Sequence, residues 1–301
     1  MRFSIRRSLC TAFFFFASFN MSYGHCDEAM HYIYPQSQSL SDDRRSDVIS
    51  LMHEALKATE AKYGPFVLKP ADVNVNYKRA TQMLRQEDRI TVAWLDTTKQ
   101  LEKILLPVLI PIQKGIVGYR VLIIRSEDEA KFFDIDTVEE LRQYQNGLVS
   151  GWVNEPIMNV NQLPYVRSVN YEDLFKMLAA ERFDYFSRGM VEAYTELEDR
   201  SEVFPNLMVE KHILLHYAKP MYLFTSKNRP VLNKRLNEGL MLLIEDGSFE
   251  KIFCQFHGDS IRQTNLSERI QIQLKSNLLL SSAPKEKKFW FDPTKNTCQQ
   301  R

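Results

Sequence analysis

The chain has 301 residues, of which 39 are basic and 38 acidic, so its formal net charge is +1. This balance, without a basic stripe that carries interleaved aromatic residues, argues against nucleic acid as a partner. The length suits one large domain or two lobes of ordinary size, and hydrophobic residues, at 44 % of the chain, can support a full core.

The first 24 residues have the three parts of a secretory signal peptide. A start with three arginines is followed by an apolar run over 9–19, and Ser22 and Gly24 are small residues just before a cut at His25. The apolar run is about half of the ~20 residues that span a bilayer. We therefore expect cleavage, and a mature protein that is periplasmic.

Hydrophobic periodicity predicts alternating strands and helices in the next part of the chain. The apolar run over 90–95 is typical of a strand buried on both faces of a parallel sheet. The expected elements are a strand over 31–35, a helix over 45–62, a strand over 66–68, a helix over 77–85 and a strand over 90–95. This order is that of a doubly wound α/β sheet.

The following segment differs and marks a change of lobe. Two apolar runs, 104–112 and 119–124, are separated by Gly115 and Gly118, and we interpret them as the crossing from one lobe to a second. Alternation then restarts with a helix whose capping box begins at Thr137. The further expected elements are strands over 147–152, 165–169 and 184–187, helices over 171–181 and 190–197, returning strands over 212–217 and 221–226, and a helix over 231–245.

Ordered stretches along nearly the whole mature chain carry a resemblance to a known family, and two of them are the longest guides to its later part. They are YEDLFKMLAAERFDYFSRGMVEAYTEL over 171–197 and LNKRLNEGLMLLIEDGSFEKIF over 232–253. They resemble the periplasmic solute-binding proteins of family 3, which have the type II periplasmic-binding fold. The resemblance implies an α/β protein whose second lobe is inserted into the first and whose hinge closes on a solute. Because the alternation of helices and strands restarts after the crossing, we assign 27–115 plus 218–275 to lobe one, 119–212 to lobe two and 276–301 to a C-terminal tail.

The same resemblance implies a changed ligand. Family members that bind free amino acids carry an Arg three residues after a Thr, which pairs with the ligand carboxylate, but the stretch over 97–101 reads TTKQL. Their ammonium-binding Asp falls on Gly189, and the Gly-Thr or Gly-Ser at a helix start is Gly151-Trp152. We therefore expect the fold to be retained and the ligand not to be an ordinary amino acid.

The expected ligand site is a cleft between the lobes, at the carboxyl ends of the strands. The candidate residues are Tyr34, Trp94, Asp96 and Thr97 on lobe one, and Trp152, Arg188 and Glu192 on lobe two. Arg188 offers a two-pronged donor to an anionic or carbonyl-rich solute, and Trp152 offers a flat wall. The alternative is that Arg188 pairs with Glu192 while Trp152 packs beneath a helix. Trp94 suits a core equally, and we expect Arg120 to brace the hinge.

The function expected from these features is binding of a small solute by a monomer that delivers it to an ABC-transporter permease, with no cofactor and no metal. A sensor that docks onto a membrane receptor is the first alternative. An enzyme on the same fold, resembling dehydratases or transglycosylases, is the second, with Glu192 or Asp96 as acid or base. The sequence has no H-E-x-x-H motif or phosphate loop to support it.

Three cysteines follow the signal peptide: Cys26, Cys254 and Cys298. An oxidising compartment favours one disulfide, and we predict the pair Cys254–Cys298 because Cys26 lies near a chain end. Three free thiols remain the alternative, since cysteine pairing cannot be deduced from sequence alone.

Overall fold

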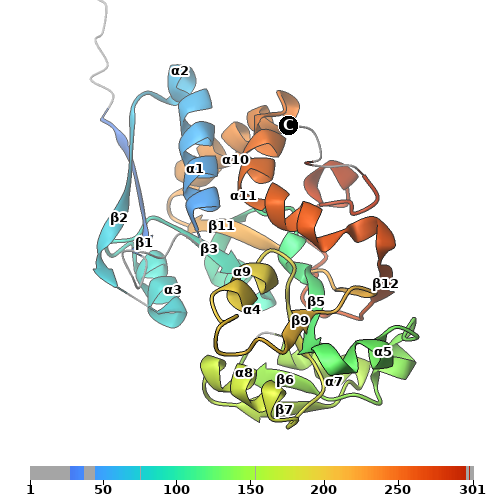
Figure 1. Ribbon diagram of the computed structural model, residues 1–301. Coiled ribbons are helices and arrows are strands. Elements are labelled where there is room, and N and C mark those ends of the chain that lie inside the picture. The colour runs from blue at the N-terminus through green and yellow to red at the C-terminus, as the bar shows by residue number, and fades with distance from the viewer. Residues whose placement is uncertain (1–27, 37–44, 75, 153, 296–297, 299–301) are drawn as a thin grey trace, which may run out of the picture.

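The structure is a computed structural model that describes residues 28–36, 45–74, 76–152, 154–295 and 298. The predicted signal peptide and Cys26 lie outside the described residues. Two α/β units are stacked in Figure 1, with the blue and most of the orange chain above and the green and yellow chain below. No helix within the described ranges is both long and apolar enough to cross a membrane.

Strand β11 is central in the upper unit, lobe one. It pairs antiparallel with β3 and with β4, while β1 and β2 form a parallel pair in contact with β3. The strands are β1 (Met30–Gln36), β2 (Phe66–Asn74), β3 (Val92–Asp96), β4 (Leu105–Val108) and β11 (Met221–Ser226). The sequence predicts a parallel sheet around the 90–95 strand, whereas β3 pairs antiparallel with β11. A buried apolar run does not indicate the direction of the neighbouring strand.

Helices cover both faces of this sheet, which explains the buried run. Val92 packs into the core with α1 and α10, and the next residue, Ala93, packs on the opposite side with α3. The helices of lobe one are α1 (Ser46–Ala58), α2 (Glu60–Tyr63), α3 (Tyr77–Gln86), α4 (Lys99–Ile104) and α10 (Pro230–Glu245). The predicted helix over 231–245 is α10.

Helix α10 approaches α1 closely because it carries glycine at the contact. A Cβ atom on Gly239 would lie 2.1 Å from the carbonyl oxygen of Ala55. One turn earlier on α10, the buried Arg235 donates to the carbonyl oxygens of Leu56 at 3.1 Å and Gly64 at 2.8 Å. These carbonyls end α1 and α2, so α10 fixes both helices in place.

Strand β5 (Tyr119–Arg125) is buried along its length and is the centre of lobe two. It pairs antiparallel with β8, β9 and β10, while β10 pairs parallel with β12 and β6 pairs parallel with β7. The other strands are β6 (Asn146–Val149), β7 (Tyr165–Ser168), β8 (Phe186–Gly189), β9 (Leu207–Val209), β10 (Ile213–His216) and β12 (Ile270–Gln273). The helices are α5 (Glu129–Phe132), α6 (Val138–Leu141), α7 (Glu155–Asn161), α8 (Tyr171–Ala179) and α9 (Ala193–Glu198). The predicted capping box at Thr137 is confirmed at the start of α6.

Two of the segments that join the lobes are neighbours, one after β4 and one between β10 and β11. The amide of Tyr217 donates to the carbonyl of Gly118 at 3.2 Å, and a Cβ on Gly118 would lie 2.1 Å from the Tyr217 carbonyl oxygen. The two crossings therefore run side by side. The domain ranges stay a prediction. Strand β12 lies within 218–275, the range expected for lobe one, but it pairs with β10 of lobe two. Helix α11 (Ser248–Thr264) carries the chain across to it.

A buried carboxylate ties α1 to the first crossing and to α11. The side chain of Asp47 accepts hydrogen bonds from Gln113 Nε2 at 2.6 Å and from His257 Nε2 at 3.0 Å. Burial acts to raise the pKa of Asp47, but these hydrogen bonds outweigh it and hold that pKa below its ordinary value. Asp47 is therefore a charged anchor at the hinge.

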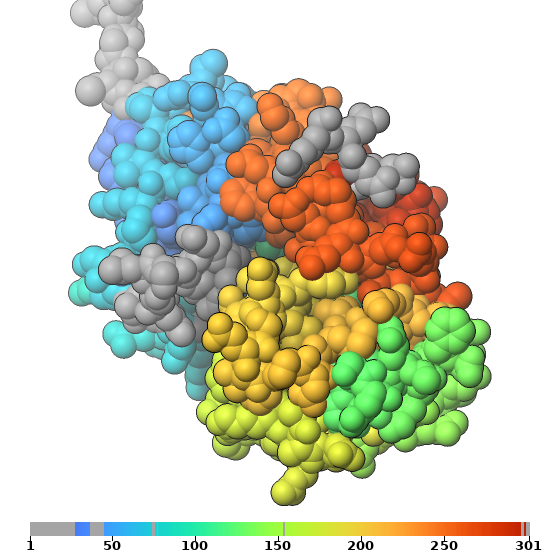
Figure 2. Space-filling view, in the orientation of Figure 1, coloured from blue at the N-terminus to red at the C-terminus, as the bar shows by residue number. Residues whose placement is uncertain are grey.

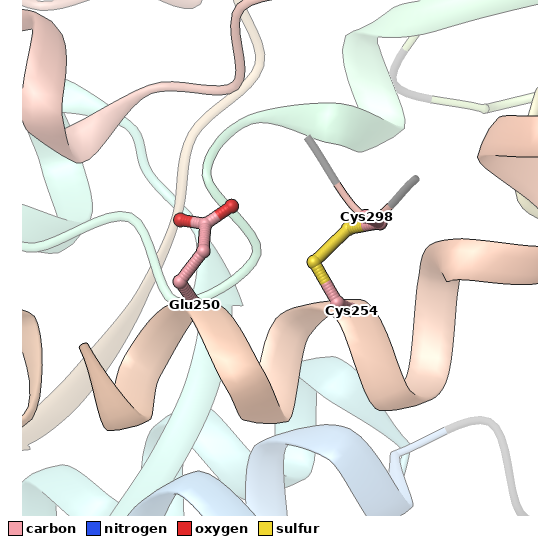
Figure 3. Close-up of side chains that lie close together, drawn as sticks. All are labelled: Glu250, Cys254 and Cys298. Carbon is pink, nitrogen blue, oxygen red and sulfur yellow. A yellow bond between two sulfur atoms is a disulfide. The ribbon is translucent and has the colours of Figure 1, made fainter. Parts of the chain in front are cut away.

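The C-terminal tail is fastened to α11 and to the first crossing. The predicted disulfide between Cys254 and Cys298 is confirmed, with Cα atoms 5.0 Å apart (Figure 3). The amide of Phe291 donates to the carbonyl of Lys114 at 2.8 Å, and its ring packs edge-on against Tyr119. In Figure 1 the red tail accordingly lies beside the orange α11.

Candidate functional site

The aromatic candidates of lobe one lie together on β1 and β3. The ring centroids of Tyr34 and Trp94 are 5.8 Å apart, and both side chains are partly buried. Both also pack against the core between the sheet and α1, so the expectation that Trp94 suits a core holds alongside the site hypothesis.

The polar candidates of lobe one differ in their surroundings. Asp96 ends β3, and its Oδ2 lies 3.5 Å from the Nζ of Lys219, which belongs to the second crossing. Thr97 is buried, and its hydroxyl donates to Oε1 of Glu102 at 2.9 Å, a contact within the same lobe. Asp96 therefore faces the junction between lobes, whereas Thr97 organises the start of α4.

Arg188 is held by two carboxylates of its own lobe. Its Nε donates to Glu196 at 2.7 Å, and its Nη2 lies 3.0 Å from a carboxylate oxygen of Glu192. The guanidinium carbon lies 5.1 Å from the ring centroid of Trp152 and 5.3 Å from that of Tyr171. The arrangement is the structural alternative raised from the sequence, in which Arg188 pairs with Glu192 and Trp152 packs against its neighbours.

Glu192 lies just before α9 and is surrounded by cations from both lobes. Loss of hydration acts to raise its pKa, but the nearby charges of Arg188, Arg120, Lys219 and Arg45 hold the pKa below its ordinary value. Arg45 stands at the start of α1 in lobe one, so Glu192 is the point where the charges of the two lobes meet. We call Arg45, Asp96, Arg120, Arg188, Glu192 and Lys219 the charged junction.

The lack of a side chain at Gly189 leaves room for the carboxylate of Glu192 in the charged junction. A Cβ on Gly189 would lie 2.9 Å from Oε2 of Glu192 and 3.5 Å from Nη1 of Arg120. The carboxylate of Glu192 therefore takes up space beside the position where the family resemblance places an Asp. The prediction that Arg120 braces the hinge is confirmed, since it donates to the carbonyl oxygen of Ser187 at 2.8 Å and of Val117 at 3.4 Å.

Sequence reasoning missed Arg45 and Lys219 of the charged junction, and it missed Glu196, which pairs with Arg188. Lys219 is the one charged residue between the two strands predicted at 212–217 and 221–226, which was an available signal. Glu196 gave no signal, because its pairing with Arg188 depends on how the chain turns between β8 and α9.

A possible metal site is excluded in this state of the protein. Ligand atoms of Glu250, Cys254 and Cys298 lie within 4.8 Å of one another, the one such group of three in the described part of the chain. Figure 3 shows that the two sulfur atoms are bonded to each other, so neither is a thiolate that could bind a metal.

Comparison with known proteins identifies the architecture. No protein-family model matches the sequence, and no curated protein does. A Salmonella typhimurium periplasmic binding protein of high arginine specificity matches with a TM-score of 0.51 at 14 % identity, over 76 % of this chain and 99 % of its own. The chain has the type II periplasmic-binding fold.

Two further solved structures connect this fold to different roles. One comes from work on glutathione import through GshT and the cystine ABC importer TcyBC of Streptococcus mutans, with a TM-score of 0.53, 16 % identity and coverage of 77 % and 96 %. The other is a histidine kinase sensor domain similar to periplasmic binding proteins, with a TM-score of 0.50, 15 % identity and coverage of 76 % and 95 %. At these identities the likeness establishes the fold and not the ligand.

Proposed function

We propose that this protein is an exported, monomeric solute-binding protein that holds a small molecule between its lobes and delivers it to an ABC importer. The fold supports a binding role, because the matching structures are described as binding proteins, an importer component or a sensor. The charged junction carries the proposal further, since Asp96 and Arg45 of lobe one meet Glu192 of lobe two around Lys219. In Figure 2 the yellow surface of lobe two borders the orange surface above it.

The residues of the junction favour a solute with an acidic or carbonyl group. Arg45, Arg120, Arg188 and Lys219 outnumber the carboxylates that they face, and Glu196 already occupies Arg188. Lys219 and Arg45 are therefore the donors that we assign to the solute, while Arg188 and its Trp152 stack position the carboxylate of Glu192.

The remainder of the solute is a ring or an aliphatic body. Tyr34 and Trp94 provide a pair of aromatic side chains on the lobe-one side, which suits a flat or apolar surface. We do not expect an ordinary amino acid, because the stretch over 97–101 contains no Arg to serve as the family's carboxylate-binding residue. We expect carboxylates without an α-ammonium group to bind better than common L-amino acids.

A ligand screen tests this proposal. The mature protein, starting at His25, is screened by thermal shift against a library of carboxylates and amino acids, and each compound that raises the melting temperature is measured by calorimetry. A ligand at one hundred times its Kd stabilises the folded form by about 2.7 kcal/mol. Lys219→Gln and Trp94→Ala should weaken binding at least tenfold, about 1.4 kcal/mol. The matched control Lys211→Gln, on an exposed lysine of lobe two, should not.

Two results would contradict the proposal. One is a bound compound whose affinity is the same in Lys219→Gln as in the unchanged protein. The other is micromolar binding of a common L-amino acid that depends on none of the junction residues. Either result would place the ligand elsewhere or restore the amino-acid role.

The sensor alternative has one observation in its favour, the match to a histidine kinase sensor domain. Uptake of the labelled solute by cells with and without the gene separates the two roles. Lost uptake supports delivery to an importer, whereas unchanged uptake with an altered transcriptional response supports sensing. In the enzyme alternative, the lowered pKa of Glu192 disfavours its use as a general acid and leaves the role of general base to be tested.

A further inference from the structure

A cavity lies away from the charged junction, between α11 and the C-terminal tail. Its volume is about 1010 Å³, and none of the seven sequence-predicted site residues lines it. One wall is formed by α11 between Phe249 and Arg262, and the opposite wall by the tail residues Lys287, Lys288, Trp290, Asp292, Lys295 and Cys298. The molecule therefore has room for a ligand that the inter-lobe proposal does not use.

The lining of this cavity is basic. Six basic and three acidic residues line it. Each acid has a cation within 4.0 Å, in the pairs Lys114–Glu250, Arg262–Asp259 and Lys295–Asp292. Within the described residues, no ion pair within 4.0 Å involves Lys251, Lys287 or Lys288, although the charge of Lys287 also acts on Asp292. The six basic residues exceed the three acids, so the lining is net positive. A field of this kind attracts an anion.

The floor of the cavity is preorganised. Lys114 is only 9 % exposed, pairs with Glu250 and stands 5.4 Å from the ring centroid of Phe253. The Oε1 atom of Glu250 is buried and accepts no hydrogen bond from the described residues. A buried carboxylate oxygen without a donor is costly, and rotation of the Glu250 side chain, which is 42 % exposed as a whole, would let a ligand hydroxyl donate to it.

The tail wall is held in place by several contacts. Trp290 packs over Gly115, where an added Cβ would lie 2.9 Å from the indole, and its Nε1 donates to the carbonyl of Pro284 at 2.9 Å. The disulfide fixes the end of the tail to α11 one turn beyond Glu250 (Figure 3). Trp290 thus presents a fixed aromatic side chain, a common surface for the apolar face of a sugar ring.

We propose that this cavity binds a small hydroxylated anion of the sugar-phosphate or sugar-acid class. The anionic group pairs with Lys251, Lys287 and Lys288. A hydroxyl group donates to Glu250, and the ring lies against Trp290. This site is independent of the inter-lobe site, so its test stands whether or not a transported solute is found.

The test is calorimetry of the mature protein with glucose 6-phosphate at low ionic strength. Inorganic phosphate and glucose serve as the anion-only and hydroxyl-only probes. Glucose 6-phosphate should bind more tightly than either one. The Lys287→Gln/Lys288→Gln double variant should lose affinity about tenfold, because two charge contacts are removed at the cavity mouth. Lys57→Gln, on an exposed lysine of α1, is the matched control and should bind normally.

A second variant tests the tail wall, and circular dichroism checks that it folds. Cys298→Ser should weaken binding of glucose 6-phosphate while the spectrum is retained. Phosphate binding as tightly as glucose 6-phosphate overturns the assignment of a sugar. Absence of binding to the unchanged protein at millimolar concentration, or equal binding in the double variant, overturns the site.

Discussion

Replacing Arg188 by methionine removes a charge from a largely buried pair and keeps most of the side-chain volume. The Arg188 side chain is 10 % exposed and that of Glu196 is 19 % exposed, so the substitution leaves Glu196 without its partner in a poorly hydrated place. Removing one member of a buried ion pair costs about 3–5 kcal/mol. Glu192 is 41 % exposed and regains water, so we expect the lower end, about 3 kcal/mol.

The assay is thermal unfolding of the empty protein, compared with the Arg167→Met control. Arg167 also pairs with a glutamate, Glu155, and stacks on a tyrosine, but its side chain is 56 % exposed. The Arg188 variant should melt about 6–12 °C lower. An exposed pair contributes at most about 1 kcal/mol, so the control should change little. An Arg188 variant that melts within about 2 °C of the unchanged protein but no longer binds its solute would refute the positioning role.

Three further predictions concern stability, all measured by urea unfolding. Gly239→Ala gains about 1 kcal/mol of helix propensity but pushes α10 off the α1 backbone, so we expect a net loss of about 1–2 kcal/mol; equal or higher stability would show that the helices shift at no cost. Cys298→Ser should lose about 2–4 kcal/mol, and reductant should then have no further effect on the variant. Because the pKa of Asp47 is lowered by folding, its stabilisation is present above pH ~3.9 and is lost as the pH falls through the folded-state pKa. As the pH falls below about 4, the free energy of unfolding should therefore decrease less in Asp47→Asn than in the unchanged protein. Parallel plots of unfolding free energy against pH for the two proteins would contradict this.

The sequence was most informative where structure depends on local chemistry. The capping box at Thr137 and the long helix before Gly247 were both predicted, since caps and a single apolar stripe are readable within a few turns. Helix α11 was missed. Its apolar residues serve two cores, Phe249 in lobe one and Ile261 in lobe two, so they form no single stripe.

The candidate site shows the same division. Strand ends led to Asp96 and Glu192, which both lie in the charged junction, because the fold class fixes where strands end. Their contact with a ligand stays a prediction. The partners of Arg188 depended on a turn of the chain that no periodicity reports. The contact of Lys219 with Asp96 joins segments far apart in the sequence, and only the folded chain brings them together.

The sharing of α11 between two cores limits how far the lobes can separate. Phe249 is buried with the residues of lobe one, and Phe253 and Ile261 are buried with those of lobe two. A wide swing would expose one of these sets to water, at about 1.5–3 kcal/mol for each side chain uncovered. Empty and loaded protein should therefore differ by a small sliding movement, with nearly equal radii of gyration in small-angle X-ray scattering.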